Sequence, residues 1–237
     1  AKESVVVEER DVLFAQPASF LLIGKSGSGK TTFLMNFLRD HRRLGHTRSY
    51  TRVYVFFKEA QNGLYDKIAA FMDEPGCVVR LHHGGIPEGF YNELDPNESN
   101  LVIIDDLFRE AMNSVDVHDA FTSGRHRSCT IILCSQNVFP VGTKFGRTMS
   151  LNAQYIVLFR ARDSRQIRTL YGQYAGDTKG NKTFIAKAFK DATNPIGGYL
   201  LLDTSTQQKV EELRVRTNVF APITELVVYL PTETDKD

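Results

Sequence analysis

Short apolar runs alternate with segments of helical periodicity along most of the chain. The helical segments include Phe33–Arg42 and Phe184–Phe189. Because strands joined by helices usually form a parallel sheet, this alternation predicts an α/β fold with a mostly parallel sheet and helices on both faces. The apolar runs predict strands at Ser4–Glu8, Phe20–Ile23, Arg52–Phe57, Val78–Leu81, Leu101–Asp105, Thr130–Cys134, Tyr155–Arg160, Tyr199–Asp203 and Glu212–Thr217.

The length of 237 residues suits one domain over 1–237, with a core over about 16–203 and a C-terminal strand and tail over 204–237. The segment His82–Asn100 is rich in glycine, proline, asparagine and acidic residues, which predicts a long surface loop. No apolar run approaches the roughly twenty residues of a membrane span, and no signal-peptide pattern opens the chain. We therefore expect no membrane partner.

Charge, cysteines and histidines narrow the function classes. The net charge is +1, so nucleic-acid contact requires local basic clusters or an assembled ring. The cysteines have no paired metal spacing, and two of them lie in apolar strand-like runs, which predicts buried thiols in an intracellular, reducing compartment. The histidines fit no zinc template and are predicted to lie on the surface, with one adjacent pair in a polar loop. The cysteines are Cys77, Cys129 and Cys134, and the histidines are His41, His46, His82, His83, His118 and His126.

The segment Gly24–Thr31 matches the P-loop template G-x-x-x-x-G-K-[ST] at every fixed position. It follows a predicted strand and precedes a predicted helix, as a phosphate-binding loop should. A glycine-rich turn without a ligand is the alternative, and the flanking elements favour the phosphate site. The chain is therefore expected to bind ATP. The expected binding residues are Gly24, Lys25, Ser26, Gly27, Ser28, Gly29, Lys30, Thr31 and Thr32.

Two side chains of the P-loop are predicted to contact the nucleotide and its metal ion. Lys30 can reach the β- and γ-phosphates and is predicted to be catalytic. The Thr31 hydroxyl can ligate Mg²⁺. Backbone N–H groups of the loop and the N-terminus of the following helix add positive potential at the phosphates.

The run Leu101–Asp105, followed by Asp106, is the second chemical signal. A buried strand that ends in a carboxylate supplies what an NTPase needs to hold hydrated Mg²⁺. A second carboxylate directly after it can act as general base on the attacking water. We therefore predict that Asp105 lies on the metal and that Asp106 is the base, against the alternative of two acids in a surface turn.

A third polar strand end follows the apolar run Thr130–Cys134. Gln136 stands there and can hydrogen-bond the γ-phosphate or the attacking water. The alternative is a polar exit from the strand into a loop. With the two preceding motifs in the same chain, we predict a sensor role for Gln136 in catalysis.

Several arginines can act on the active site of a neighbouring subunit, where a guanidinium neutralises charge in the transition state. Arg125 and Arg127 directly precede the sensor strand, and Arg147 lies in a predicted loop. Each one taken singly can also be an ordinary surface residue. These three are the candidates for a catalytic arginine that acts in trans.

The three motifs together resemble the FtsK–HerA superfamily of DNA-pumping ATPases. The closer similarity is to its viral branch, the genome-packaging ATPases of large DNA viruses, virophages and Polinton/Maverick elements, although Gly124-Arg125 departs from the His-rich version of that branch. Distinctive motifs include Gly124–Arg127, Ser135–Phe139 and Gly198–Asp203. The resembling stretches are Phe20–Phe33, Leu101–Leu107, Phe121–Phe139, Arg147–Leu170 and Ala188–Asp203.

The resemblance implies a RecA-like (ASCE) P-loop NTPase fold in which the sensor strand lies between the P-loop strand and the Asp105 strand. It implies a homo-oligomeric ring, a pentamer or hexamer, with the nucleotide between subunits and double-stranded DNA in the channel. It further implies a capsid or portal partner and a location in the host nucleus or viral factory. Segments Arg160–Arg168 and Val141–Arg147 are candidates for DNA contacts, which would be independent of sequence and sensitive to salt.

Two other functions stay open at this point. Many short P-loop proteins are kinases of small molecules, and others are slow nucleotide-gated modules that serve assembly. Release of phosphate without an acceptor distinguishes the translocase from a kinase. Stimulation of that release by DNA distinguishes it from an assembly module.

Overall fold

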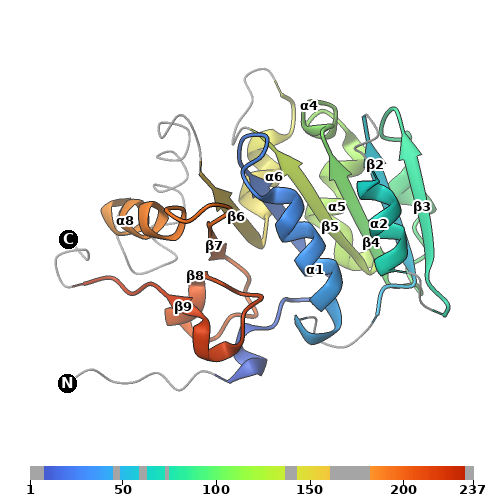
Figure 1. The fold of residues 1–237 in the computed structure, drawn as a ribbon. Helices are drawn as coiled ribbons and strands as arrows, with labels where there is room; N and C mark the ends of the chain where they lie inside the picture. Colours follow the sequence, from blue (N-terminus) through green and yellow to red (C-terminus); the bar gives the residue numbers. More distant parts are fainter. Residues whose placement is uncertain are drawn as a thin grey trace.

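The computed structural model of the protein describes residues 8–44, 49–58, 63–72, 75–136, 143–160 and 182–232. A nine-stranded sheet forms the centre of this part of the chain, in the order β3-β2-β4-β5-β1-β6-β7-β8-β9 (Figure 1). The strands are β1 (Ser19–Ile23), β2 (Arg52–Phe57), β3 (Val78–His83), β4 (Asn100–Asp105), β5 (Cys129–Ser135), β6 (Tyr155–Phe159), β7 (Tyr199–Asp203), β8 (Val215–Thr217) and β9 (Val227–Val228).

The sheet has a parallel and an antiparallel part. Strands β3, β2, β4, β5, β1 and β6 all run parallel to their neighbours. Strands β7, β8 and β9 continue the sheet in antiparallel fashion from β6. Strands β1, β4, β5 and β6 are buried along their whole length because helices cover both faces, and this explains why they appear in the sequence as continuous apolar runs, whereas the edge strand β3 is largely exposed.

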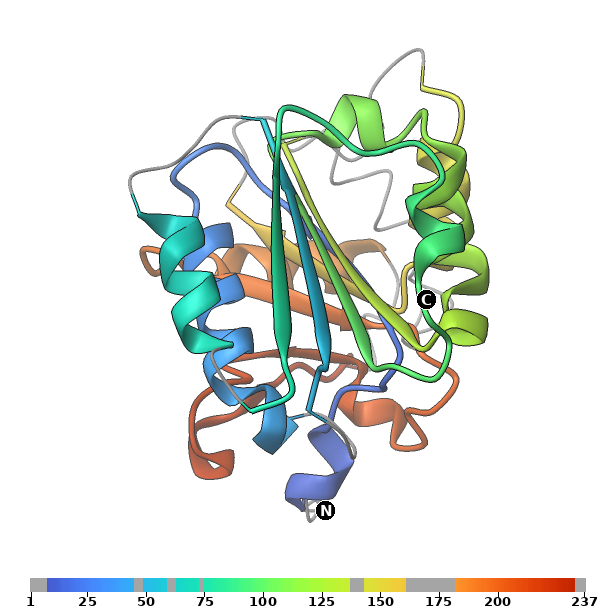
Figure 2. The same ribbon diagram turned by 90° about the vertical axis from the view of Figure 1, so that its right-hand side faces the viewer.

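Helices lie on both faces of the sheet, as predicted (Figure 2). Helices α1 and α2 cover one face, whose core includes Phe20, Leu22 and Phe33. Helices α3, α5 and α6 cover the other face, whose core includes Leu21, Ile23 and Phe121. The helices are α1 (Lys30–Leu44), α2 (Leu64–Phe71), α3 (Phe90–Glu93), α4 (Phe108–Ala111), α5 (Val115–Ser123), α6 (Gly146–Asn152) and α8 (Lys182–Ala192), with 3-10 turns η1 (Glu9–Val12), η2 (Gly124–Arg127), η4 (Glu211–Arg214) and η5 (Ile223–Glu225).

Some predicted elements are wrong. The segment His82–Asn100 is not a simple surface loop, because β3 continues to His83 and the buried side chains of Phe90 and Leu94 anchor the rest to the core. The histidine pair lies on the edge strand β3 rather than in a loop. His41 is buried, not on the surface, and its Nδ1 lies 2.6 Å from the Leu38 carbonyl oxygen.

The C-terminal strand is shorter than predicted, since Glu211–Arg214 forms the turn η4 and only Val215–Thr217 pairs with β7. The predicted strand Ser4–Glu8 falls outside the described residues except for Glu8. Among the helices of the described residues, none has the length and apolar character that a membrane crossing requires.

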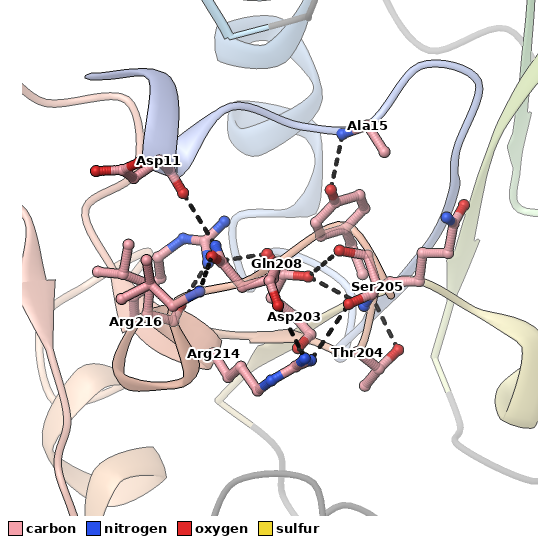
Figure 3. A network of polar contacts seen from close by, with 12 residues as sticks. Asp11, Ala15, Asp203, Thr204, Ser205, Gln208, Arg214 and Arg216 are labelled. Atoms are coloured by element: carbon pink, nitrogen blue, oxygen red, sulfur yellow. Dashed lines mark hydrogen bonds and ion pairs between the residues drawn. The ribbon is translucent and has the colours of Figure 1, made fainter. Parts of the chain in front are cut away.

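A buried ion pair connects the last strands to β7 (Figure 3). Arg216 on β8 donates from Nη1 to Oδ2 of Asp203 at 3.0 Å, and both side chains are inaccessible to solvent. Ser205 donates from its hydroxyl to the other carboxylate oxygen at 2.6 Å. Arg214 donates to the carbonyl oxygens of Asp203 and Gln208. The carboxylate thus has a partner on each oxygen, which a buried charge requires.

The same network reaches the N-terminal segment. Gln208 donates from its side-chain amide to the carbonyl oxygen of Asp11 at 3.0 Å. The Ala15 amide donates to the Tyr155 hydroxyl at 2.7 Å. The segment before β1 is therefore held against β6 and β7 by polar contacts as well as by the packing of Phe14 on Phe20.

We expect the substitution Asp203→Asn to lower the free energy of unfolding by about 3–5 kcal/mol, because it leaves the buried Arg216 charge without a counter-charge. Chemical denaturation measures this change. The matched control is Glu8→Gln, which breaks the exposed ion pair between Arg10 and Glu8 and should cost less than about 1 kcal/mol. Equal, small effects of both substitutions would contradict a structural role for the buried pair.

Candidate active site

The strand register brings the predicted chemical groups to one edge of the sheet. In the parallel pair β1–β5, Ile23 lies opposite Ser135, and in β4–β5, Ile104 lies opposite Leu133. The P-loop, the Asp105-Asp106 pair and Gln136 therefore all follow the carboxyl ends of adjacent strands. The sensor strand β5 lies between the P-loop strand β1 and the Asp105 strand β4, so the strand order implied by the resemblance is confirmed.

The P-loop has a backbone that depends on its glycines. Gly27 and Gly29 have φ values of 71° and 112°, which side chains disfavour. A Cβ on Gly24 would lie 2.6 Å from the Phe159 Cβ, so no larger residue fits there. The Gly24 amide donates to the Ser135 carbonyl oxygen at 3.0 Å and fixes the start of the loop to the end of β5.

The Lys30 ammonium lies within the loop that it is predicted to serve. Its Nζ donates to the carbonyl oxygens of Gly24 at 2.5 Å and Lys25 at 3.0 Å. Helix α1 begins at Lys30, so its unpaired N–H groups and the positive end of its dipole face the same loop. These groups form a site for an anion with several charged oxygens, such as a polyphosphate.

Asp105 is a buried carboxylate, 6% exposed, at the end of β4. Burial and the neighbouring Asp106 raise its pKa, while Lys30 and a hydrogen bond from Tyr65 act in the opposite direction. The Tyr65 hydroxyl donates to Oδ2 of Asp105 at 3.4 Å, and its ring stacks on Phe57 with ring centres 3.8 Å apart. Tyr65 therefore orients the carboxylate that is predicted to face the metal.

Sequence reasoning missed Tyr65. It lies on α2, where the sequence pattern is that of an ordinary amphipathic helix packed on a sheet. Its hydroxyl meets Asp105 forty positions further along the chain only because β2 and β4 are neighbours in the sheet. A contact of that kind has no signal in the local sequence.

Asp106 has an unusual, left-handed backbone conformation. Its φ is 57°, in the left-handed region that only glycine, asparagine and aspartate adopt at small cost. The side chain is exposed, in contrast to the buried Asp105. The turn thus directs one carboxylate into the protein and leaves the next accessible to a reacting water.

Gln136 is exposed and follows β5 directly, one residue after the Ser135 carbonyl that contacts the P-loop. Two residues earlier, on β5, burial raises the pKa of the Cys134 thiol well above its ordinary value, so this cysteine stays neutral beside Asp105. Residues 137–142 lie outside the described part of the chain. The position of Gln136 between β1 and β4 agrees with the predicted sensor role.

The residues present fit a hydrated Mg²⁺. The donor set is the hydroxyl of Thr31, in the first turn of α1, and the carboxylate of Asp105, both hard oxygen ligands. The carboxylate lies in a buried, charge-crowded place where a cation would offset the repulsion from Asp106. Mg²⁺ normally keeps several waters and is held by few protein oxygens, as here.

The three candidate arginines lie in different places. Arg125 and Arg127 are on η2, which precedes β5. They therefore lie at the amino ends of the parallel strands, whereas the P-loop lies at the carboxyl ends. A seven-residue strand separates the two ends of the sheet by about 23 Å, so neither side chain can reach the P-loop of its own chain. Arg127 donates to the Leu94 carbonyl oxygen at 3.2 Å, whereas Arg125 is exposed. Arg147 does not lie in a loop as predicted: it is exposed in the first turn of α6.

Arg160 directly follows β6, the other neighbour of β1, and is exposed at the same edge as the P-loop. Of the two segments predicted to contact DNA, residues 161–168 of the first and 141–142 of the second fall outside the described residues.

Because the pKa of Asp105 is raised, the free energy of unfolding should depend on pH. The folded protein holds this proton more tightly than the unfolded chain, whose ordinary value is 3.8, so stability falls as pH rises between the two pKa values and stays lower above them. Asp105→Asn should therefore stabilise the protein at pH 8 in the presence of a chelator, and the gain should vanish below pH 3.8. Urea denaturation at both pH values measures it. A loss of stability at pH 8 would contradict the described burial.

No family model matches the chain, and no curated protein is similar to it in sequence. Solved structures do share its fold. The genome packaging NTPase B204 from Sulfolobus turreted icosahedral virus 2 in complex with AMP is 17% identical and has a TM-score of 0.50, covering 79% of this chain and 92% of that chain. Its complex with ATP-gammaS is 14% identical with a TM-score of 0.50, over 90% and 97% of the two chains.

A structure of ATPases 2 and 3 of EssC from Geobacillus thermodenitrificans is 13% identical and has a TM-score of 0.54, covering 93% of this chain and 41% of that one. At such identities the similarity concerns the fold. This chain is a mixed α/β protein with a mostly parallel central sheet, arranged as in P-loop ATPases.

Proposed function

We propose that the protein is an ATPase that uses Mg²⁺ and drives the movement of double-stranded DNA. The observation that carries the ATPase assignment is the convergence of Lys30, the Asp105-Asp106 pair and Gln136 on three adjacent parallel strands. Each group alone has an ordinary structural explanation. A polyphosphate site, a buried metal-facing carboxylate, an exposed carboxylate and an amide at one sheet edge together form the set that ATP hydrolysis needs.

In the proposed mechanism the P-loop amides and Lys30 hold the β- and γ-phosphates and stabilise the charge that develops in the transition state. Asp106 accepts a proton from the attacking water, for which its exposed position is suited. Gln136 hydrogen-bonds the γ-phosphate or that water. Thr31 and Asp105 would hold Mg²⁺, which would neutralise part of the phosphate charge. Tyr65 keeps the Asp105 carboxylate in position.

The DNA-translocase assignment rests on two supports. The sequence motifs resemble the FtsK–HerA superfamily, with the closest similarity in the Polinton/Maverick and virophage branch. Independently, the fold is similar to that of a genome packaging NTPase of a virus, B204. On this proposal the chain forms a homo-oligomeric ring around double-stranded DNA and threads a viral or transposon genome into a capsid, in the host nucleus or a viral factory.

The ring proposal gives the arginines a role that one chain alone cannot. Arg125 and Arg127 lie about a strand length away from their own P-loop, and in a ring such a surface can face the P-loop of the next subunit. Arg127 is already engaged with the Leu94 carbonyl oxygen, which leaves Arg125 and Arg147 as the more accessible candidates.

We expect ATP hydrolysis to increase when double-stranded DNA is added and to rise more steeply than linearly with protein concentration. Both follow if the active site is completed by a neighbouring subunit on DNA. Steady-state release of phosphate, measured with and without DNA over a range of salt, is the test, and the DNA effect should weaken with salt. Hydrolysis indifferent to DNA and to protein concentration would favour an assembly module, and release only with an acceptor would favour a kinase.

The substitution Asp106→Asn should lower the turnover number by at least about 100-fold and leave ATP affinity within about twofold, because the carboxylate acts on the water alone. Asparagine also tolerates the left-handed backbone at this position, so the turn is preserved. The matched control Lys30→Ala should instead lose affinity for ATP. Calorimetric titration with ATP separates the two, and parental turnover in Asp106→Asn would remove Asp106 as the base.

A further inference from the structure

A tight turn between α8 and β7 lies directly against the P-loop. A Cβ on Gly29 would come within 3.1 Å of the Gly197 Cα and 3.2 Å of its carbonyl oxygen. Gly29 immediately precedes Lys30, the residue that binds phosphate in the proposed site. The turn, residues 194–198, is therefore part of the wall of that site although it is distant in sequence.

The turn is held in place by its own hydrogen bonds. The Asn194 amide donates to the Asp191 carbonyl oxygen at 3.1 Å, and the Gly198 amide donates to that of Pro195 at 3.0 Å. Gly197 has a φ of 73°, and a Cβ on Gly198 would collide with the Ala192 carbonyl oxygen. The turn is thus built to present its tip, Ile196, in one orientation.

Ile196 is the most exposed large apolar side chain of the described residues. Its exposure is 106%, against 55% for Leu151, the next in order. A single exposed isoleucine is common on protein surfaces, but this one lies beside the candidate phosphate site, where a bound molecule could cover it and gain the free energy of burial.

The proposed mechanism gives a direction to the nucleotide. It places the γ-phosphate beside Asp106 and Gln136, on the β4–β5 side of the P-loop. A triphosphate that crosses the loop from there would have its nucleoside on the opposite side, where β6 and β7 lie. Phe159 at the end of β6 packs under Gly24, and the turn at Ile196 stands next to it against Gly29.

We propose that the turn 194–198 forms the nucleoside subsite of this ATPase and that Ile196 packs against the base or ribose of ATP. The inference rests on the proposed function, since it names a further binding residue of the same site. An apolar contact of this kind adds affinity for any nucleoside and discriminates little between bases. The turn lies on the side of the sheet to which α8 belongs, well apart from β2 and β3 (Figure 1).

Calorimetric titration of the full chain with ATP, ADP and inorganic tripolyphosphate tests the proposal. Ile196→Ser should weaken ATP and ADP about 3- to 10-fold, the change expected when about half an isoleucine side chain is covered. Binding of tripolyphosphate, which has no nucleoside, should stay unchanged. Ile196→Val should retain most of the affinity, and Leu151→Ser, exposed at the opposite edge of the sheet, is the matched control.

The outcomes separate the two proposals. If the parent chain binds neither ATP nor tripolyphosphate, the proposed function fails. If the parent binds ATP and Ile196→Ser binds it equally well, the nucleoside subsite is wrong while the ATPase stands. Equal weakening of tripolyphosphate and ATP would also overturn the inference, because it would place the effect on the P-loop. A changed oligomeric state with unchanged ATP affinity would assign Ile196 to a subunit contact instead.

Discussion

The parallel register of β1, β5 and β4 is the constraint on which the site depends. Polar residues that follow these strands meet only because the strands run in one direction and their carboxyl ends coincide. The hydrogen bond from the Gly24 amide to the Ser135 carbonyl oxygen extends the β1–β5 pairing past the strand end and fixes where the P-loop begins. A shift of one residue in this register would exchange the two sets of β5 side chains between the two packed faces and move Gln136 by about 3.3 Å along the sheet, away from the loop.

The site also concentrates features that a protein would not keep for stability alone. Asp105 carries a charge that burial disfavours, Asp106 adopts a left-handed backbone, and Gly24 admits no larger side chain. Such features persist where the surrounding structure holds them in place, here through the buried sheet and the Tyr65 hydroxyl. This cluster of unfavourable local choices at one sheet edge is itself a reason to regard that edge as the functional one.

The sequence predicted what depends on local pattern and missed what depends on contacts between distant segments. Most strands of the parallel part begin and end within two residues of their predicted bounds, because continuous apolar runs identify strands buried on both faces. The P-loop and the acidic pair were found because their spacing is set by the chemistry of phosphate and Mg²⁺. Tyr65 and Ile196 were missed, since each acts through a neighbour that only the folded sheet provides. The segment around Phe90 was mistaken for a loop because it is rich in glycine and proline. Its few buried side chains, Phe90, Tyr91 and Leu94, do not form a recognisable pattern in the sequence.

The antiparallel addition to the sheet now has a physical reason. Because β7 runs opposite to β6, it begins at the edge where the parallel strands end, and Tyr199 pairs with Phe159 beside the P-loop. The turn that precedes β7 and carries Ile196 therefore lies at the P-loop end of the sheet, whereas the turn preceding a parallel strand would lie at the other end. At its other end β7 finishes in Asp203, whose buried pair with Arg216 ties the strand to β8. One strand thus runs from the P-loop end of the sheet to a buried charge pair at its other end.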